Sequence, residues 1–80
     1  MALINVNKME KGQKDRLVLH QVVDSTFYVF TTASGEKVLQ IDTFGSNHRE
    51  FQGKVSQSVQ FDTKSAERLF HILKDEFDLK

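Results

Sequence analysis

Two stretches of alternating polarity, Lys37–Phe44 and Val55–Phe61, place the tightest constraint on how this 80-residue chain can fold. A period of two sustained over such a length is typical of half-buried β-strands. The two runs together predict a sheet with one apolar and one polar face. The apolar face carries Leu39, Ile41, Val55, Val59 and Phe61. The polar face carries Gln40, Asp42, Phe44, Ser56, Ser58 and Gln60.

Two further strands are predicted upstream, at residues 16–24 and 27–32. The loop at residues 33–36 then closes a hairpin, in which Gly35 can adopt a positive φ. A longer polar loop, residues 45–54, separates the third strand from the fourth.

The first predicted strand has its own alternation. Leu17, Leu19 and Val23 fall on one face, while Arg16 and His20 fall on the other. The residues that follow, Asp24-Ser25, favour a turn into the second strand.

A C-terminal helix is predicted over residues 64–77, with Asp62 or Thr63 as its N-cap. Its apolar side chains recur at helical spacing and form a stripe that is broad for a helix covering one small sheet. Core packing alone is one explanation. The other is contact with the helix of a second copy, since an interface stabilises a core this small. The candidate dimer contacts are Leu69, Phe70, Ile72, Leu73 and Phe77.

Length and composition narrow the class of protein. Eighty residues allow a single domain, here residues 15–80, preceded by a flexible arm at residues 1–14. The absence of cysteine excludes disulfides and thiolate metal sites. The 11 basic and 11 acidic residues balance, which argues against a simple polybasic nucleic-acid binder. No apolar run is long enough for a signal peptide or a membrane span, so we expect an intracellular protein.

The sequence shows no pattern typical of a catalytic or metal site. His20, His48 and His71 stand far apart and do not form the spaced pair of a zinc helix. A triad of Asp42, His48 and a serine would need a water-excluding pocket, for which so small a sheet has little depth. We therefore expect no enzyme activity, no metal and no cofactor; a small hydrolase is the least favoured hypothesis.

The outward side chains of the strands suit single-stranded nucleic acid, because aromatic rings stack on bases and cations neutralise phosphates. The alternative is that Phe44 folds into the edge of the core and that the polar row is ordinary solvated sheet. The candidate nucleic-acid contacts are Arg16, His20, Tyr28, Phe30, Lys37, Gln40, Phe44, Arg49, Lys54, Ser56 and Ser58.

The run KVLQIDTF, a polar loop, the run GKVSQSVQF and a final helix together resemble the positive cofactor four family of transcriptional coactivators, especially its small bacterial and phage members. The resemblance covers residues 16–77. The matching residues are Lys37, Ile41, Phe44, Gly53 and Lys54. The sequence departs from the family pattern at Asp42, where relatives usually carry a basic residue.

This resemblance implies an α+β fold in which a curved, antiparallel four-stranded sheet precedes one C-terminal helix (ββββα), with a homodimer formed through the helix. It implies binding of single-stranded or melted duplex DNA in transcription, replication, recombination or repair, alongside the transcription or replication machinery. Phe44 would stack on a base, while Lys37 and Lys54 would contact phosphates. The protein would be DNA-associated in the cytoplasm or nucleoid, or in the host cytoplasm if phage-encoded. A protein-interaction module of the same fold is the second hypothesis.

Overall fold

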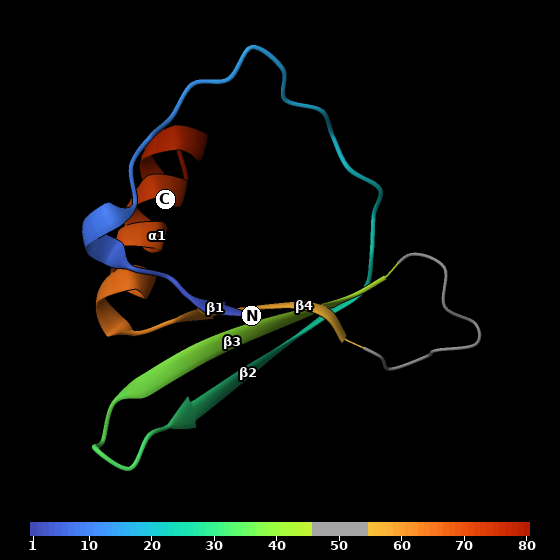
Figure 1. Cartoon of the computed structure of the whole chain (residues 1–80). Helices are drawn as coiled ribbons and strands as arrows, with labels where there is room; N and C mark the ends of the chain where they lie inside the picture. Colours follow the sequence, from blue (N-terminus) through green and yellow to red (C-terminus); the bar gives the residue numbers. More distant parts are fainter. Residues whose placement is uncertain (46–54) are drawn as a thin grey trace.

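The computed structural model, which describes residues 1–45 and 55–80, shows an α+β fold (Figure 1). In these residues a four-stranded sheet with the order β1-β4-β3-β2 is followed by one C-terminal helix. The elements along the chain are β1 (Ala2–Leu3), the short 3-10 helix η1 (Val6–Lys8), β2 (Ser25–Thr31), β3 (Lys37–Phe44), β4 (Val55–Phe61) and α1 (Thr63–Phe77). The α+β class and the C-terminal helix expected from the sequence are thus confirmed.

β2 and β3 form the expected antiparallel hairpin, with Phe27 opposite Ile41 and Tyr28 opposite Gln40. The connecting turn is closed by a hydrogen bond from the Gly35 amide to the Thr32 carbonyl, 2.9 Å long. Gly35 has φ of 91°, a conformation that costs little only in glycine, and this confirms its predicted role.

β3 and β4 pair antiparallel, but the register shifts near the end of β3. Thr43 lies opposite Gln57, while Phe44 lies opposite Val55, so Ser56 is the extra residue of a β-bulge. The predicted alternation therefore fails at this end of β4. Val55 is brought opposite Phe44 instead of staying in line with Val59 on the apolar face.

The prediction of a fully antiparallel sheet with a first strand at residues 16–24 is wrong. The sheet is mixed, because β1 pairs parallel to β4 and takes the fourth position. The physical reason lies at Asp24, whose carbonyl accepts a 3.0 Å hydrogen bond from the Phe44 amide. Asp24 and Ser25 thus continue the line of β2 along β3, so the chain does not reverse at the predicted turn. At the other edge, the Ile4 amide donates to the Gln60 carbonyl over 2.9 Å and extends the contact that holds β1.

The helix α1 begins with a well-defined cap. Asp62 has extended backbone, and its Oδ1 accepts hydrogen bonds from the Ser65 amide and the Ser65 hydroxyl, both 2.9 Å long. These bonds from Ser65 lower the pKa of the Asp62 carboxyl, because they favour its ionised form. At the far end Asp78 is left-handed, with φ of 54°, and stops the helix after Phe77.

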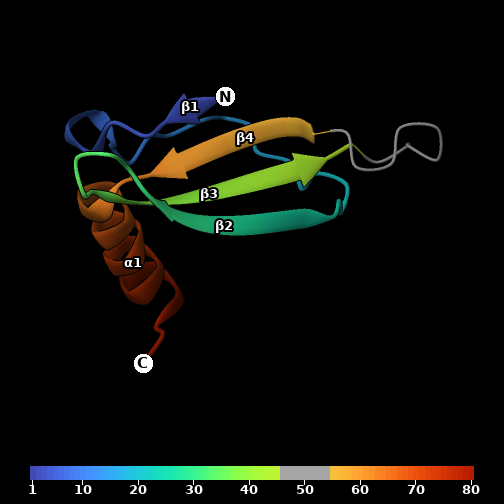
Figure 2. The same cartoon turned by 90° about the horizontal axis from the view of Figure 1, so that it is seen from below.

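The helix covers only a small part of the sheet. It leaves the sheet where β4 ends and β3 begins, and it projects away from that end (Figure 2). The segment after β1 runs along α1 (Figure 1), and Lys11 Nζ lies 3.2 Å from Glu76 Oε2. Residues 1–14, expected to form a flexible arm, thus include a short strand, a short helix and a contact with α1.

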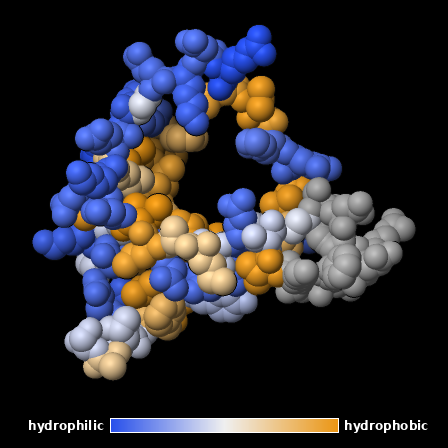
Figure 3. Space-filling view, in the orientation of Figure 1, coloured by the Kyte–Doolittle hydropathy of each residue, from blue (hydrophilic) through white to orange (hydrophobic). Residues whose placement is uncertain are grey.

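A single chain is open for its size. Its radius of gyration is 14.9 Å, whereas a compact chain of this length has about 12 Å. Its accessible surface of 7490 Å² exceeds by about 2,600 Å² the value expected for a compact monomer of this mass. Among the described residues, Val38 and Phe61 are the only buried apolar side chains, with 6% and 7% exposed. The space-filling view shows an opening between the N-terminal segment, α1 and the sheet (Figure 3).

Candidate nucleic-acid interface

The register of the strands divides the sheet into two chemically different faces. Side chains alternate along each strand, and residues directly opposite one another share a face. Tyr28, Gln40 and Gln60 stand opposite one another across β2, β3 and β4, so they share one face. We call this the polar face. The opposite, apolar face carries Phe27, Val29, Leu39, Ile41, Val59 and Phe61.

Two aromatic rings from β2 lie on the polar face. Tyr28 is opposite Gln40, and Phe30 is opposite Val38. Both rings are accessible, with 48% of Tyr28 and 41% of Phe30 exposed. Both residues were candidate nucleic-acid contacts from the sequence, and the register places both on the polar face.

Beside these rings, four polar side chains form a continuous hydrogen-bonded ladder across β3 and β4. Gln60 Nε2 donates to Gln40 Oε1 over 2.8 Å, and Gln40 Nε2 donates to Asp42 Oδ1 over 2.8 Å. Ser58 Oγ donates to the same Asp42 oxygen over 2.6 Å. Because Asp42 Oδ1 accepts from the Gln40 amide nitrogen, it fixes the orientation of the Gln40 amide and, through it, that of Gln60.

Asp42 is the anchor of this ladder and is nearly buried, with 6% exposed. It is also the only charged side chain that the paired residues of the described strands place on the polar face. The sequence placed it on the polar face through its alternation with Gln40, considered it for a catalytic triad and noted it as a departure from a family pattern, but did not predict its role as an anchor.

Phe44 closes β3 with the same parity as Gln40 and Asp42, and it is half-buried. The bulge at Ser56 brings Val55 opposite the ring. Phe44 is therefore neither fully buried nor fully exposed. This lies between the two alternatives that the sequence left open, a stacking platform and a core residue.

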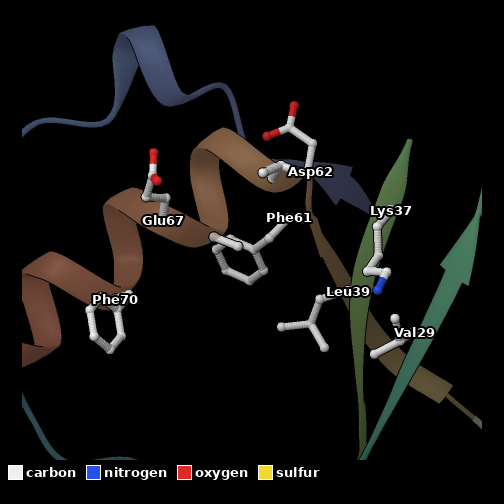
Figure 4. A pocket seen from close by; sticks show the side chains of 9 residues that line it. Val29, Lys37, Leu39, Phe61, Asp62, Glu67 and Phe70 are labelled. Carbon is white, nitrogen blue, oxygen red and sulfur yellow. The ribbon is translucent and has the colours of Figure 1, made fainter. Parts of the chain in front are cut away.

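Lys37 is placed apart from the polar face. It has the parity of Leu39 and projects on the side of α1, where it lines an apolar cavity of about 540 Å³ (Figure 4). The cavity lies between the sheet and the first turns of the helix, with Val29 and Leu39 on one side and Phe70 on the other.

The other predicted contacts are dispersed. Arg16 and His20 lie in the exposed segment before β2 and join no strand. Ser56 is the bulge residue, and Ser58 belongs to the ladder. Arg49 and Lys54 lie outside the described residues. The structure thus brings together Tyr28, Phe30, Gln40, Phe44 and Ser58.

Other kinds of site find little support in the described parts of the chain. Within residues 1–45 and 55–80, no three histidine, aspartate or glutamate side chains come together as a metal site requires. In the same residues, no helix combines the length and apolar character needed to cross a membrane.

Comparisons with known proteins do not assign this chain to a family. The chain matches no family model, no curated protein and no solved structure. The function is therefore inferred from the geometry of the polar face and from the resemblance in the strand sequences.

Proposed function

We propose that this chain is a non-catalytic single-stranded-DNA-binding protein, similar to a transcriptional coactivator, that acts on single-stranded or melted DNA in transcription, replication, recombination or repair. One observation carries the proposal: exposed aromatic rings lie beside an ordered ladder of two amides and one hydroxyl, anchored by the Asp42 carboxylate, on one face of the sheet. Tyr28 and Phe30 offer flat surfaces on which bases stack, at about 1–3 kcal/mol each. Gln40 offers an amide directly opposite Tyr28, and Gln60 and Ser58 offer further hydrogen-bonding groups one strand beyond, on the same face.

The proposed functional unit is a homodimer formed through the exposed side of α1. Phe70, Leu73 and Phe77 are exposed on this helix. Ile72 belongs to the other side, where it lines a groove together with Met9 of the same chain. A second copy would cover apolar surface that one chain leaves in water.

A protein-interaction module of the same fold is the second candidate. It is favoured by the charge of the polar face, on which the described strands place Asp42 and no lysine or arginine. DNA binding releases counterions and weakens steeply as salt rises. A sheet surface that binds another protein through neutral groups lacks this dependence.

The test is fluorescence anisotropy with a labelled oligonucleotide, single-stranded and duplex, over a range of salt concentrations. We expect preference for the single strand. Replacing Tyr28 with leucine removes a ring from the polar face, and we expect it to weaken binding by about 1–3 kcal/mol.

The matched control is Phe27→Leu, which removes the neighbouring ring from the opposite face. It should leave affinity unchanged. Equal losses in the two variants, or no binding by the parent protein, would overturn the proposal.

A further inference from the structure

The exposed segment before β2 has the composition of a strand but no strand to pair with. Leu17, Val18 and Val22 are largely exposed, and Leu19 is fully exposed. In the described structure, no backbone hydrogen bond joins residues 12–23 to another part of the chain. β-branched and large aliphatic side chains of this kind favour strands and are costly to leave in water.

The strand next to this segment has a free edge. β2 is the last strand of the sheet, and none of the described strands pairs with its outer side. All seven of its residues are exposed, and its sequence STFYVFT contains no charge and no proline. An edge strand that is long, apolar and uncharged is a template for pairing with another strand.

The segment cannot readily fold back onto its own β2. Ser25 is paired with Thr43, and the Asp24 carbonyl is bonded to Phe44, so a reversal has to occur before Asp24. That position is occupied by Val22 and Val23. Tight hairpin turns need a positive φ, which β-branched residues adopt very rarely. A strand that pairs with the outer edge of β2 is therefore expected to come from another chain.

We propose that residues 17–23 are an exchange strand that pairs antiparallel with the outer edge of β2 in a second copy of the chain. The segment and the edge belong to the same chain, so a two-fold axis makes the exchange reciprocal and satisfies both edges at once. The alternation of side chains along residues 17–23 agrees with this pairing. Continuing the alternation of β2 backwards places Leu17, Leu19 and Val23 on the apolar face with Val29.

The register that we assign places Leu19 opposite Phe27 of the partner and Val23 opposite Val23 on the two-fold axis. Leu17 then lies opposite Val29, a lining residue of the apolar cavity beneath α1, and covers its open side. The contact would bury exposed side chains of residues 17–22 and of β2, and stable interfaces bury about 800 Å² per partner.

The exchange also changes the polar face. In this register Arg16 of the partner lies opposite Phe30, and His20 of the partner lies opposite Thr26. Each copy would then supply to the other the cation that the polar face lacks. The role of this cation in binding DNA rests on the proposed function, whereas the strand exchange itself does not.

The chain contains no cysteine, which makes disulfide trapping direct. Leu19→Cys and Phe27→Cys are made in separate chains, one of them isotopically labelled, then mixed and oxidised. The masses are read under non-reducing conditions. Residues directly opposite in an antiparallel pair have Cα atoms about 4.5–5.5 Å apart, within the range of a disulfide.

We expect the mixed Leu19→Cys and Phe27→Cys pair to form a disulfide-linked heterodimer. The matched control is Val18→Cys with Phe27→Cys, in which an exposed neighbour of Leu19 points to the other face. It should give about tenfold less product, because only opposite side chains on one face come within reach. Dimer mass without the Leu19–Phe27 link would leave the proposed homodimer standing but overturn the exchange. A Leu19→Cys/Phe27→Cys double variant that forms its disulfide within one chain would also overturn the exchange.

A second variant tests the backbone. Leu19→Pro removes an amide that makes no hydrogen bond within the described chain, so the sheet of each copy should keep its circular dichroism. Dimer affinity should fall by roughly tenfold or more, since proline cannot donate to a strand ladder. Gln13→Pro, outside the exchange strand, should leave it unchanged. Unchanged dimerisation of Leu19→Pro would count against the exchange.

Discussion

At the scale of single residues, Asp42 has the largest effect on the polar face because three side chains depend on it. Asp42→Ala would leave the Ser58 hydroxyl and the Gln40 amide without their acceptor. We expect the free energy of unfolding in urea to fall by about 1–3 kcal/mol, since two hydrogen bonds between partly buried groups are lost, each contributing about 0.5–1.5 kcal/mol.

Asp42→Asn is the matched variant for this prediction. It retains one acceptor oxygen at the same distance along the side chain, so its loss should be clearly smaller. Equal stability of the two variants would mean that the ladder does not stabilise the sheet.

Phe44 gives a second prediction at this scale. Its ring is half-buried and shares the polar face with Gln40. Phe44→Ala should weaken binding to single-stranded DNA by about 1–3 kcal/mol if a base stacks on the accessible part of the ring. A thermal melt and a binding isotherm are measured on the same variant. A large drop in melting temperature with unaltered affinity of the folded fraction would show a packing role only.

The sequence predicted residues well wherever simple alternation holds. Gln40, Phe44 and Ser58 were assigned to one face from parity alone, and the register agrees. Ser56 and Val55 were misplaced, because a bulge adds one residue to a strand without leaving a clear signal in its composition. Lys37 was expected to contact phosphates, although its parity with Leu39 places it on the apolar face.

At the scale of elements, the cap of α1 makes stability dependent on pH. The pKa of the Asp62 carboxyl is lowered in the folded state by the hydrogen bonds from Ser65. A lowered folded pKa means that this stabilisation is complete above the unfolded pKa and is lost as pH falls through the folded pKa. Asp62→Ala should therefore lower the melting temperature at neutral pH, and the difference from the parent protein should shrink in acid.

Asp62→Asn separates the charge from the cap. Asparagine caps helices about as well as aspartate, so this variant should melt close to the parent protein at neutral pH. Its melting temperature should depend less on acid. If the Ala and Asn variants melted alike at every pH, the cap would contribute nothing.

The strands predicted at Lys37–Phe44 and Val55–Phe61 have the bounds of β3 and β4, and the helix begins within one residue of its predicted start. These elements were predictable because alternation and capping are local signals. The strand predicted at residues 16–24 is missing from the sheet, although its local signal is as strong. Pairing needs a partner edge, and the Val22-Val23 pair before Asp24 offers no turn that would bring the segment to one.

At the scale of the whole molecule, the apolar surface of the single chain is the main property that local patterns could not predict. A broad apolar stripe on the helix suggested an interface, yet it gave no indication that only Val38 and Phe61 would be buried among the described apolar residues. So small a core stabilises a single chain only weakly. Folding and association are therefore expected to be coupled, and the melting temperature should rise with protein concentration.

The last prediction concerns the helix contact of the proposed homodimer. Light scattering at micromolar concentration should give about twice the 9.2 kDa mass of the chain. Phe70 is exposed on α1 and lines the apolar cavity, so Phe70→Glu would place a charge in the interface and should shift the mass toward that of one chain. Lys64→Glu, an exposed charge near the start of the same helix, controls for added negative charge and should leave the mass unchanged. A parent protein that remains monomeric at this concentration would contradict both the helix contact and the strand exchange. A Phe70→Glu variant that stays dimeric would contradict the helix contact alone and leave the β2 edge as the interface.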